Sequence, residues 1–227
     1  MTRALVLLRK GKDYQKEARD ALLVASAARP DVAAVGDMIL NLDISLVDVE
    51  NAEKHARQLL RQNRQNKLAN YVMGSIRLQQ NQLETAETFL RLSVAQERPL
   101  ASAQNDLAEV LRRQKKYAEA EKAARDATKT DPELYVAWET LASILLDQNK
   151  DLAEAETCVN TAIELVKKIT PEGDPRMLIT LARAQLAKND ITHFNTTVRT
   201  LNGKRGQLKA GDLAAFEELQ KAARGKR

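Results

Sequence analysis

The sequence predicts an all-α protein built from repeated pairs of helices. Much of its apolar fraction is Ala and Leu, which are both strong helix formers. Only 8 Gly and 5 Pro occur among 227 residues, so the turns that strands require are scarce. The third observation is a period of about 34 residues in the positions of small and apolar side chains. Together these features exclude an ordinary mixed α/β domain.

The period appears in several parallel series of residues. Small side chains recur at Gly74, Ala108 and Ala142, with Leu40 one step earlier. A second series is Ala18, Ala52, Ala86, Ala120 and Ala155. A third series is Leu22, Ala56, Leu90, Ala124 and Val159. A fourth series is Ala25, Leu59, Ser93, Ala127 and Ala162. A period of this length indicates a solenoid, in which each unit is a helix pair and small residues mark the closest approach of two helices.

The spacing resembles the tetratricopeptide repeat family, whose pattern is W-x2-L-G-x2-Y, then A-x3-F, then P. Trp138, Leu141, Ala142 and Leu145 match its first half, and another copy contains Leu107, Ala108, Leu111, Ala120, Ala124 and Pro132. The resemblance implies a right-handed superhelical solenoid of antiparallel helices, called A and B in each repeat.

In chain order, the pattern predicts one solenoid over residues 1–203 followed by a basic capping helix and tail over residues 204–227. The expected repeats are 1–32, 33–66, 67–100, 101–134, 135–169 and a degenerate sixth at 174–203. By phase, Met1 falls at the third position of the first A helix. Either this helix is short or the chain is a fragment of a longer protein, and the fragment is favoured. The fifth repeat has one inserted residue near Gln148–Leu152.

The last two elements carry their own signals. Asp174 and Pro175 suit the start of a helix, but Phe194 stands where a small crossing residue is expected, which predicts that this B helix stands further off or shifts register. The final helix has Leu213, Phe216, Leu219 and Ala223 on one stripe, as expected of a cap over the terminal apolar face.

Charge and cysteine content limit the partners. The net charge is +5, from 36 basic and 31 acidic residues, and Gly203–Arg227 alone has seven basic and three acidic ones. The remainder is nearly neutral, which disfavours nucleic acid as a partner of the body. One cysteine excludes an intrachain disulfide, and no apolar run reaches the ~20 residues that cross a bilayer. A soluble protein is expected, cytoplasmic or, if a signal was trimmed, periplasmic; the compartment stays open.

The residues give no sign of catalysis. Phosphate-binding glycine loops are absent, and His55 and His193 lie far apart in the chain. Cys158 falls on a B helix and is expected to be a semi-buried structural thiol, and the paired carboxylates are typical of solvated helix faces. The sequence therefore predicts a non-enzymatic protein without cofactor or metal.

The family resemblance implies a concave groove lined by the second, fifth, ninth and twelfth residues of each repeat. Carried over by phase, the candidate binding residues are Asp37, Asn41, Tyr71, Ser75, Asn105, Glu109, Arg112, Glu139, Ser143, Leu146, Arg176 and Arg183, with Ile179 beside them. The early and middle positions are acidic and polar and the last are basic. Some members of the family clamp the carboxylate tails of chaperones with Lys and Asn residues. This sequence has Asp37, Asn105 and Glu109 at such positions, so binding of chaperone tails is not expected.

The predicted function is that of a scaffold or adaptor that holds an extended or helical segment of a partner protein in this groove. Bacterial members of the family occur in several compartments. Three alternatives remain open: a partner on the convex side or an edge, nucleic-acid binding through the basic C-terminus, and self-assembly through an uncapped terminal repeat.

Overall fold

A computed structural model describes residues 1–29 and 32–225. The described residues form thirteen α-helices and two short 3-10 helices, without strands, and the predicted all-α helix-pair fold is confirmed. Clustering of contacts divides the chain into two compact units, Met1–Val110 (unit 1) and Leu111–Arg227 (unit 2), of which residues 226–227 lie outside the described part.

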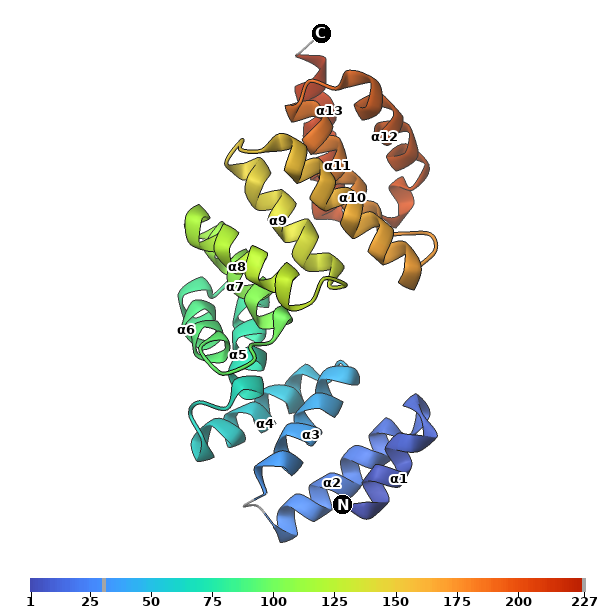
Figure 1. Ribbon diagram of the computed structural model, residues 1–227. Helices are drawn as coiled ribbons and strands as arrows, with labels where there is room; N and C mark the ends of the chain where they lie inside the picture. Colours follow the sequence, from blue (N-terminus) through green and yellow to red (C-terminus); the bar gives the residue numbers. More distant parts are fainter. Residues whose placement is uncertain (30–31, 226–227) are drawn as a thin grey trace. The chain divides into compact units, whose positions relative to one another are not determined.

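Unit 1 contains α1 (Thr2–Lys10), the 3-10 helix Lys12–Tyr14, α2 (Gln15–Ala28), α3 (Ala33–Ser45), α4 (Val49–Gln62), α5 (Lys67–Gln79), α6 (Leu83–Val94) and the first part of α7 (Ala101–Arg113). From α1 to α6 each helix packs on the next along the chain, as in the antiparallel pair α1 and α2 in Figure 1. The helices α3 and α5 also contact each other, so the A helices of neighbouring repeats lie side by side. We call the A helices of this unit its A-helix layer.

Unit 2 continues with α8 (Tyr117–Thr130), α9 (Tyr135–Asp147), α10 (Leu152–Ile169), α11 (Pro175–Ala187), α12 (Ile191–Gly203), the 3-10 helix Arg205–Gln207 and α13 (Ala210–Arg224). The helix α11 packs on α9, and α13 packs on α11, so α13 occupies the place of a further A helix. The predicted stripe on α13 is confirmed, because Phe216 and Ala223 are buried and Leu213 and Leu219 pack against the same cluster.

The small residues of the 34-residue series lie in the core. Ala52, Ala86, Ala120 and Ala155 are buried in their B helices, as are Gly74, Ala108 and Ala142 in their A helices. A Cβ atom on Gly74 would lie 2.5 Å from Leu90 Cγ, so this crossing leaves no room for a side chain. Steric contact between helices therefore explains the series.

In the second to sixth repeats, the turn from the A helix to the B helix has the same backbone form. One residue in each turn has a positive φ: Val47 (56°), Asn81 (58°), Lys115 (61°), Asn149 (50°) and Asn189 (61°). The amide of the next residue donates to a carbonyl five positions back, as Asp48 N does to Asp43 O at 2.9 Å. This geometry is the Schellman motif, which satisfies carbonyls at the helix end.

The insertion in the fifth repeat is confirmed and located by the backbone. Asn149 keeps the phase of the other turns, and Asp151 adds a second left-handed residue (φ 43°) before α10 begins at Leu152. Helix α10 starts one residue later than the 34-residue period requires. Its buried Ala155 therefore follows Ala120 by 35 positions instead of 34.

The sixth repeat begins as the sequence indicates. The Asp174 carboxylate accepts a hydrogen bond from Arg176 N at 2.9 Å, and Pro175 is the first residue of α11. Phe194 is buried in one cluster with Leu201 and with Phe216 of α13. The aromatic ring at this small-residue position is thus part of the core that α13 completes.

Candidate functional site

One candidate binding feature within unit 1 is an apolar pocket beside α5. The pocket has a volume of about 180 Å³ and is lined by Asp43, Ile44, Val47, Asp48, Val49, Ala52, Tyr71, Val72, Ser75, Ile76 and Gln79. Three of its aliphatic side chains are exposed: Ile44 (40%), Val47 (81%) and Val49 (47%). An exposed aliphatic rim around a concave site is typical of surfaces that bind a partner.

A group of hydrogen-bonded polar residues adjoins this pocket where α5 faces α7, and we call it the α5–α7 polar cluster. It consists of Tyr71, Ser75, Ser102, Asn105 and Asp106. The Ser75 hydroxyl donates to one oxygen of the Asp106 carboxylate, and Asn105 Nδ2 donates to the other at 3.4 Å. The Tyr71 hydroxyl contacts the hydroxyls of Ser75 and Ser102. Tyr71 and Ser75 belong to both the pocket and the cluster.

The environment of the cluster is unfavourable for negative charge. Burial raises the pKa of the Asp106 carboxyl, and the charge of Glu109 raises it further. Burial also raises the pKa of the Tyr71 hydroxyl, with a smaller contribution from Asp106. Both shifts have the sign expected where ionisation is opposed by desolvation.

A buried ionic network adjoins the pocket, which its members Asp43 and Asp48 help to line. Asp43 is fully buried and accepts from Arg19 Nη1 at 3.1 Å and contacts His55 Nδ1 at 2.6 Å. Arg19 also donates to Asp48 at 2.7 Å. These contacts connect α2, α3 and α4, and a buried carboxylate requires such partners. The sequence alone indicates no partner for His55, because Asp43 is 12 positions away in the chain and lies on another helix.

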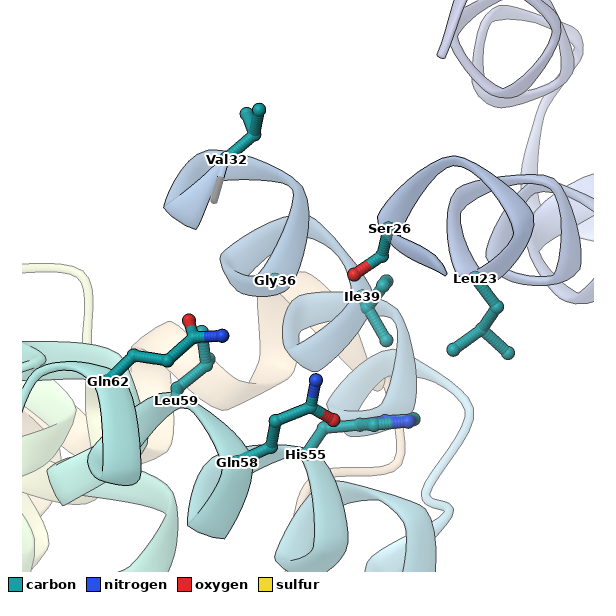
Figure 2. A pocket seen from close by; sticks show the side chains of 9 residues that line it. All are labelled: Leu23, Ser26, Val32, Gly36, Ile39, His55, Gln58, Leu59 and Gln62. Carbon is teal, nitrogen blue, oxygen red and sulfur yellow. The ribbon is translucent and has the colours of Figure 1, made fainter. Parts of the chain in front are cut away.

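Figure 2 shows a second cavity in unit 1, between α2, α3 and α4, with Ser26, Ile39 and Gln58 directed into the same region. Its volume is about 30 Å³, enough for about one water molecule and too small for a side chain of a partner. We therefore place the candidate site at the larger pocket.

The other predicted groove residues of unit 1 have different roles. The Asp37 carboxylate accepts from Asn66 Nδ2 at 2.8 Å, and Asn66 in turn caps α5 through Ala69 N. Asp37 therefore connects two A helices. Asn41 is exposed on α3, and Glu109 is half-buried on α7.

In unit 2 the predicted basic residues pair with acidic ones inside the unit. Asp147 accepts from Arg112 Nη1 at 2.7 Å and from Arg183 Nη2 at 2.5 Å. Arg176 pairs with Asp174, also at 2.5 Å. The last part of the predicted groove is therefore basic in sequence but locally neutralised in the structure. Asp147 was outside the predicted set, and no feature of the sequence assigned it two arginine partners.

The remaining predicted residues of unit 2 lie close together on α9. The carboxylate of Glu139 accepts from Ser143 Oγ at 3.2 Å and from Thr180 Oγ1 of α11 at 3.0 Å. Ser143 is 9% exposed and Leu146 is 8% exposed, so Leu146 contributes mainly to the core.

Metal-ligating and thiol side chains are dispersed over residues 1–29 and 32–225. Within that part of the chain, no three His, Cys, Asp or Glu side chains gather as metal ligands would. Cys158 is buried, and burial together with the Glu154 charge raises the pKa of its thiol to about 11. None of the described helices combines the length and apolar character needed to cross a membrane.

Comparison with known proteins agrees with the repeat geometry. A family model described as "Tetratricopeptide repeat" matches residues 101–144. The chain carries a tetratricopeptide repeat. No curated protein matches the sequence. The resemblance predicted from the sequence is confirmed.

Several solved structures share the fold. PilF of Pseudomonas aeruginosa is 15% identical with a TM-score of 0.71, covering 96% of this chain and 94% of its own. PilW, described as a type IV pilus biogenesis factor, is 14% identical with a TM-score of 0.69 and covers 94% of each chain. YrrB, described as having an unusual peptide-binding site, is 13% identical with a TM-score of 0.64, covering 89% of this chain and 99% of its own. At these identities the similarity concerns the fold alone.

Proposed function

We propose that this protein is a non-enzymatic adaptor that binds a segment of a partner protein at the pocket formed by α3, α4 and α5 of unit 1. The observation that carries the proposal is the pocket of about 180 Å³ with its exposed rim of Ile44, Val47 and Val49. An apolar side chain of the partner would enter this pocket and lose its contact with water, while the adjacent polar cluster would orient the segment.

Two further features support a protein or peptide as the partner. The pocket opens beside hydrogen-bonding groups on Tyr71 and Ser75, a combination that suits a polypeptide with its alternating apolar and polar groups. One protein of similar fold, YrrB, is described as having a peptide-binding site.

The alternative of nucleic-acid binding has less support. Among the C-terminal basic residues, Lys204 Nζ donates to Glu172 O at 2.5 Å and Arg205 pairs with Glu217. These contacts occupy cations that phosphate binding would require.

The proposal is tested by photo-crosslinking and affinity measurement. A photoreactive residue at position 44 is compared with one at position 24, because Val24 is also exposed (74%) but does not line the pocket. We expect one partner to be crosslinked from position 44 only. Its affinity for the purified chain should then fall at least about tenfold in an Ile44→Ser, Tyr71→Ala variant and stay unchanged in Val24→Ser.

Equal crosslinking from both positions, or an unchanged affinity in the double variant with an intact circular dichroism spectrum, would place the partner elsewhere. A stoichiometric complex with a second copy of the chain would favour self-assembly instead. Light scattering across a concentration series distinguishes that outcome.

A further inference from the structure

Asp106 differs in its partners from two other carboxylates on the A helices, Asp147 and Asp43. Asp147 has two arginine partners in unit 2, and Asp43 has Arg19 and His55 in unit 1. The hydrogen bonds to Asp106 in the described structure come from a hydroxyl and an amide, on Ser75 and Asn105. Neutral donors stabilise a buried carboxylate less than a cation does.

Asn105 supplies a second and independent observation. Its side chain is only 9% exposed, and one end of its amide donates to Asp106. The other end, Oδ1, is buried and has no hydrogen-bond partner in the described part of the chain. Buried polar atoms are nearly always paired, so an unpaired carbonyl next to a carboxylate indicates a missing donor.

The surrounding charges favour a cationic donor. In α3, α5 and residues 101–110 of α7, the acidic residues are Asp37, Asp43, Asp106 and Glu109, and the basic ones are Lys67 and Arg77. Lys67 Nζ donates to the carbonyls of Glu97 and Arg98, and Arg77 pairs with Glu53 on α4 at 2.6 Å. These two basic side chains are thus held by groups outside the cluster, and Arg112, further along α7, pairs with Asp147.

We propose that the α5–α7 polar cluster binds an arginine side chain of the partner segment. A guanidinium group has five N–H donors and no acceptor, which complements the carboxylate of Asp106, the carbonyl of Asn105 and the nearby hydroxyls. Its flat face can also stack on the aromatic ring of Tyr71. This inference rests on the proposed function and specifies the chemistry of the partner beside the apolar pocket.

The test uses the full chain and a minimal probe. N-acetyl-arginine amide is titrated into isotope-labelled protein, and the amide resonances of Ser75, Asn105 and Asp106 are followed by NMR. We expect saturable shifts with a dissociation constant on the order of 1–10 mM, as suits a ligand of this size. The matched neutral probe, N-acetyl-citrulline amide, should give none.

Two variants make the result specific. Asp106→Asn keeps the shape of the side chain and should weaken arginine binding at least about tenfold, because it replaces a charge-assisted hydrogen bond with a neutral one. Asp20→Asn removes the same unit of charge from an exposed site on α2 of unit 1 and should leave binding unchanged. Lack of saturable shifts, equal shifts with citrulline, or equal binding by Asp106→Asn would overturn the inference.

The outcome is separable from that of the proposed function. If Asp106→Asn leaves partner affinity unchanged while the Ile44→Ser, Tyr71→Ala variant loses it, the arginine site is refuted and the adaptor function stands. If neither variant alters partner affinity, both proposals fail.

Discussion

Replacing Gly74 by alanine tests the close packing of α5 on α6. The added Cβ would lie 2.5 Å from Leu90 Cγ, 2.8 Å from Leu90 Cδ2 and 3.3 Å from Leu90 N. Carbon atoms pack comfortably at about 3.5–4.0 Å, so the overlap with Leu90 Cγ is about 1 Å or more. Because Leu90 is fully buried and its backbone is also close, the two helices must separate.

The expected magnitude follows from two opposing terms. Overpacking of this kind costs about 1–3 kcal/mol, and exchanging glycine for alanine within a helix contributes about 1 kcal/mol of stability. We expect a net loss of about 1 kcal/mol in the free energy of unfolding, measured by urea denaturation and circular dichroism.

Gly36→Ala in α3 is the matched control, because it has the same gain in helix propensity. Its Cβ would meet only the side chain of Leu59, at 2.5 Å from Cδ2, and this terminal methyl group can rotate away. We expect Gly36→Ala to be neutral or slightly stabilising. The fifth repeat has Ala142 and Val159 at the positions that correspond to Gly74 and Leu90. Adding Leu90→Val to Gly74→Ala should therefore recover part of the lost free energy of unfolding. Equal stability of the two alanine variants would refute the packing argument.

Three other measurements test local features. Val47→Gly should stabilise the protein by about 1 kcal/mol in urea unfolding, because Val47 has a left-handed backbone (φ 56°) and its side chain is 81% exposed; a destabilised variant would contradict this. Hydrogen bonds from Asn51 and from Arg19 lower the pKa of Asp48 to about 2. The ionised Asp48 carboxylate therefore stabilises the folded protein fully above about pH 4, and this stabilisation is lost as the pH falls through about 2. Asp48→Asn should make the free energy of unfolding depend less on pH between about 2 and 4. An unchanged dependence on pH would count against the hydrogen bonds of Asp48 to Asn51 and Arg19. Since burial raises the pKa of the Cys158 thiol to about 11, its alkylation by iodoacetamide at pH 8 should be at least about tenfold slower in native than in denatured protein, whereas equal rates would show an accessible thiolate.

The helix-pair architecture could be predicted from the sequence because it depends on local and periodic information. The spacing of Ala52, Ala86 and Ala120 records where helices touch, and that requirement acts on each repeat in the same way. The extra residue near Asp151 was detectable for the same reason, since an insertion shifts the phase of everything after it. Tyr71, Ser75 and Asn105 were likewise assigned to one surface by their phase.

Only the tertiary structure decided how the charged side chains pair. Arg19, Asp43 and His55 meet because three helices pack together, and Asp147 holds arginines from α7 and α11, which are 35 and 36 positions away in the chain. Asp106 lies outside the predicted groove positions, and its lack of a cationic partner among the described residues becomes apparent only when those neighbours are in place. Apolar contacts between helices recur in every repeat and therefore leave a periodic pattern in the sequence. A single ion pair occurs once, between residues far apart in the chain, and leaves none.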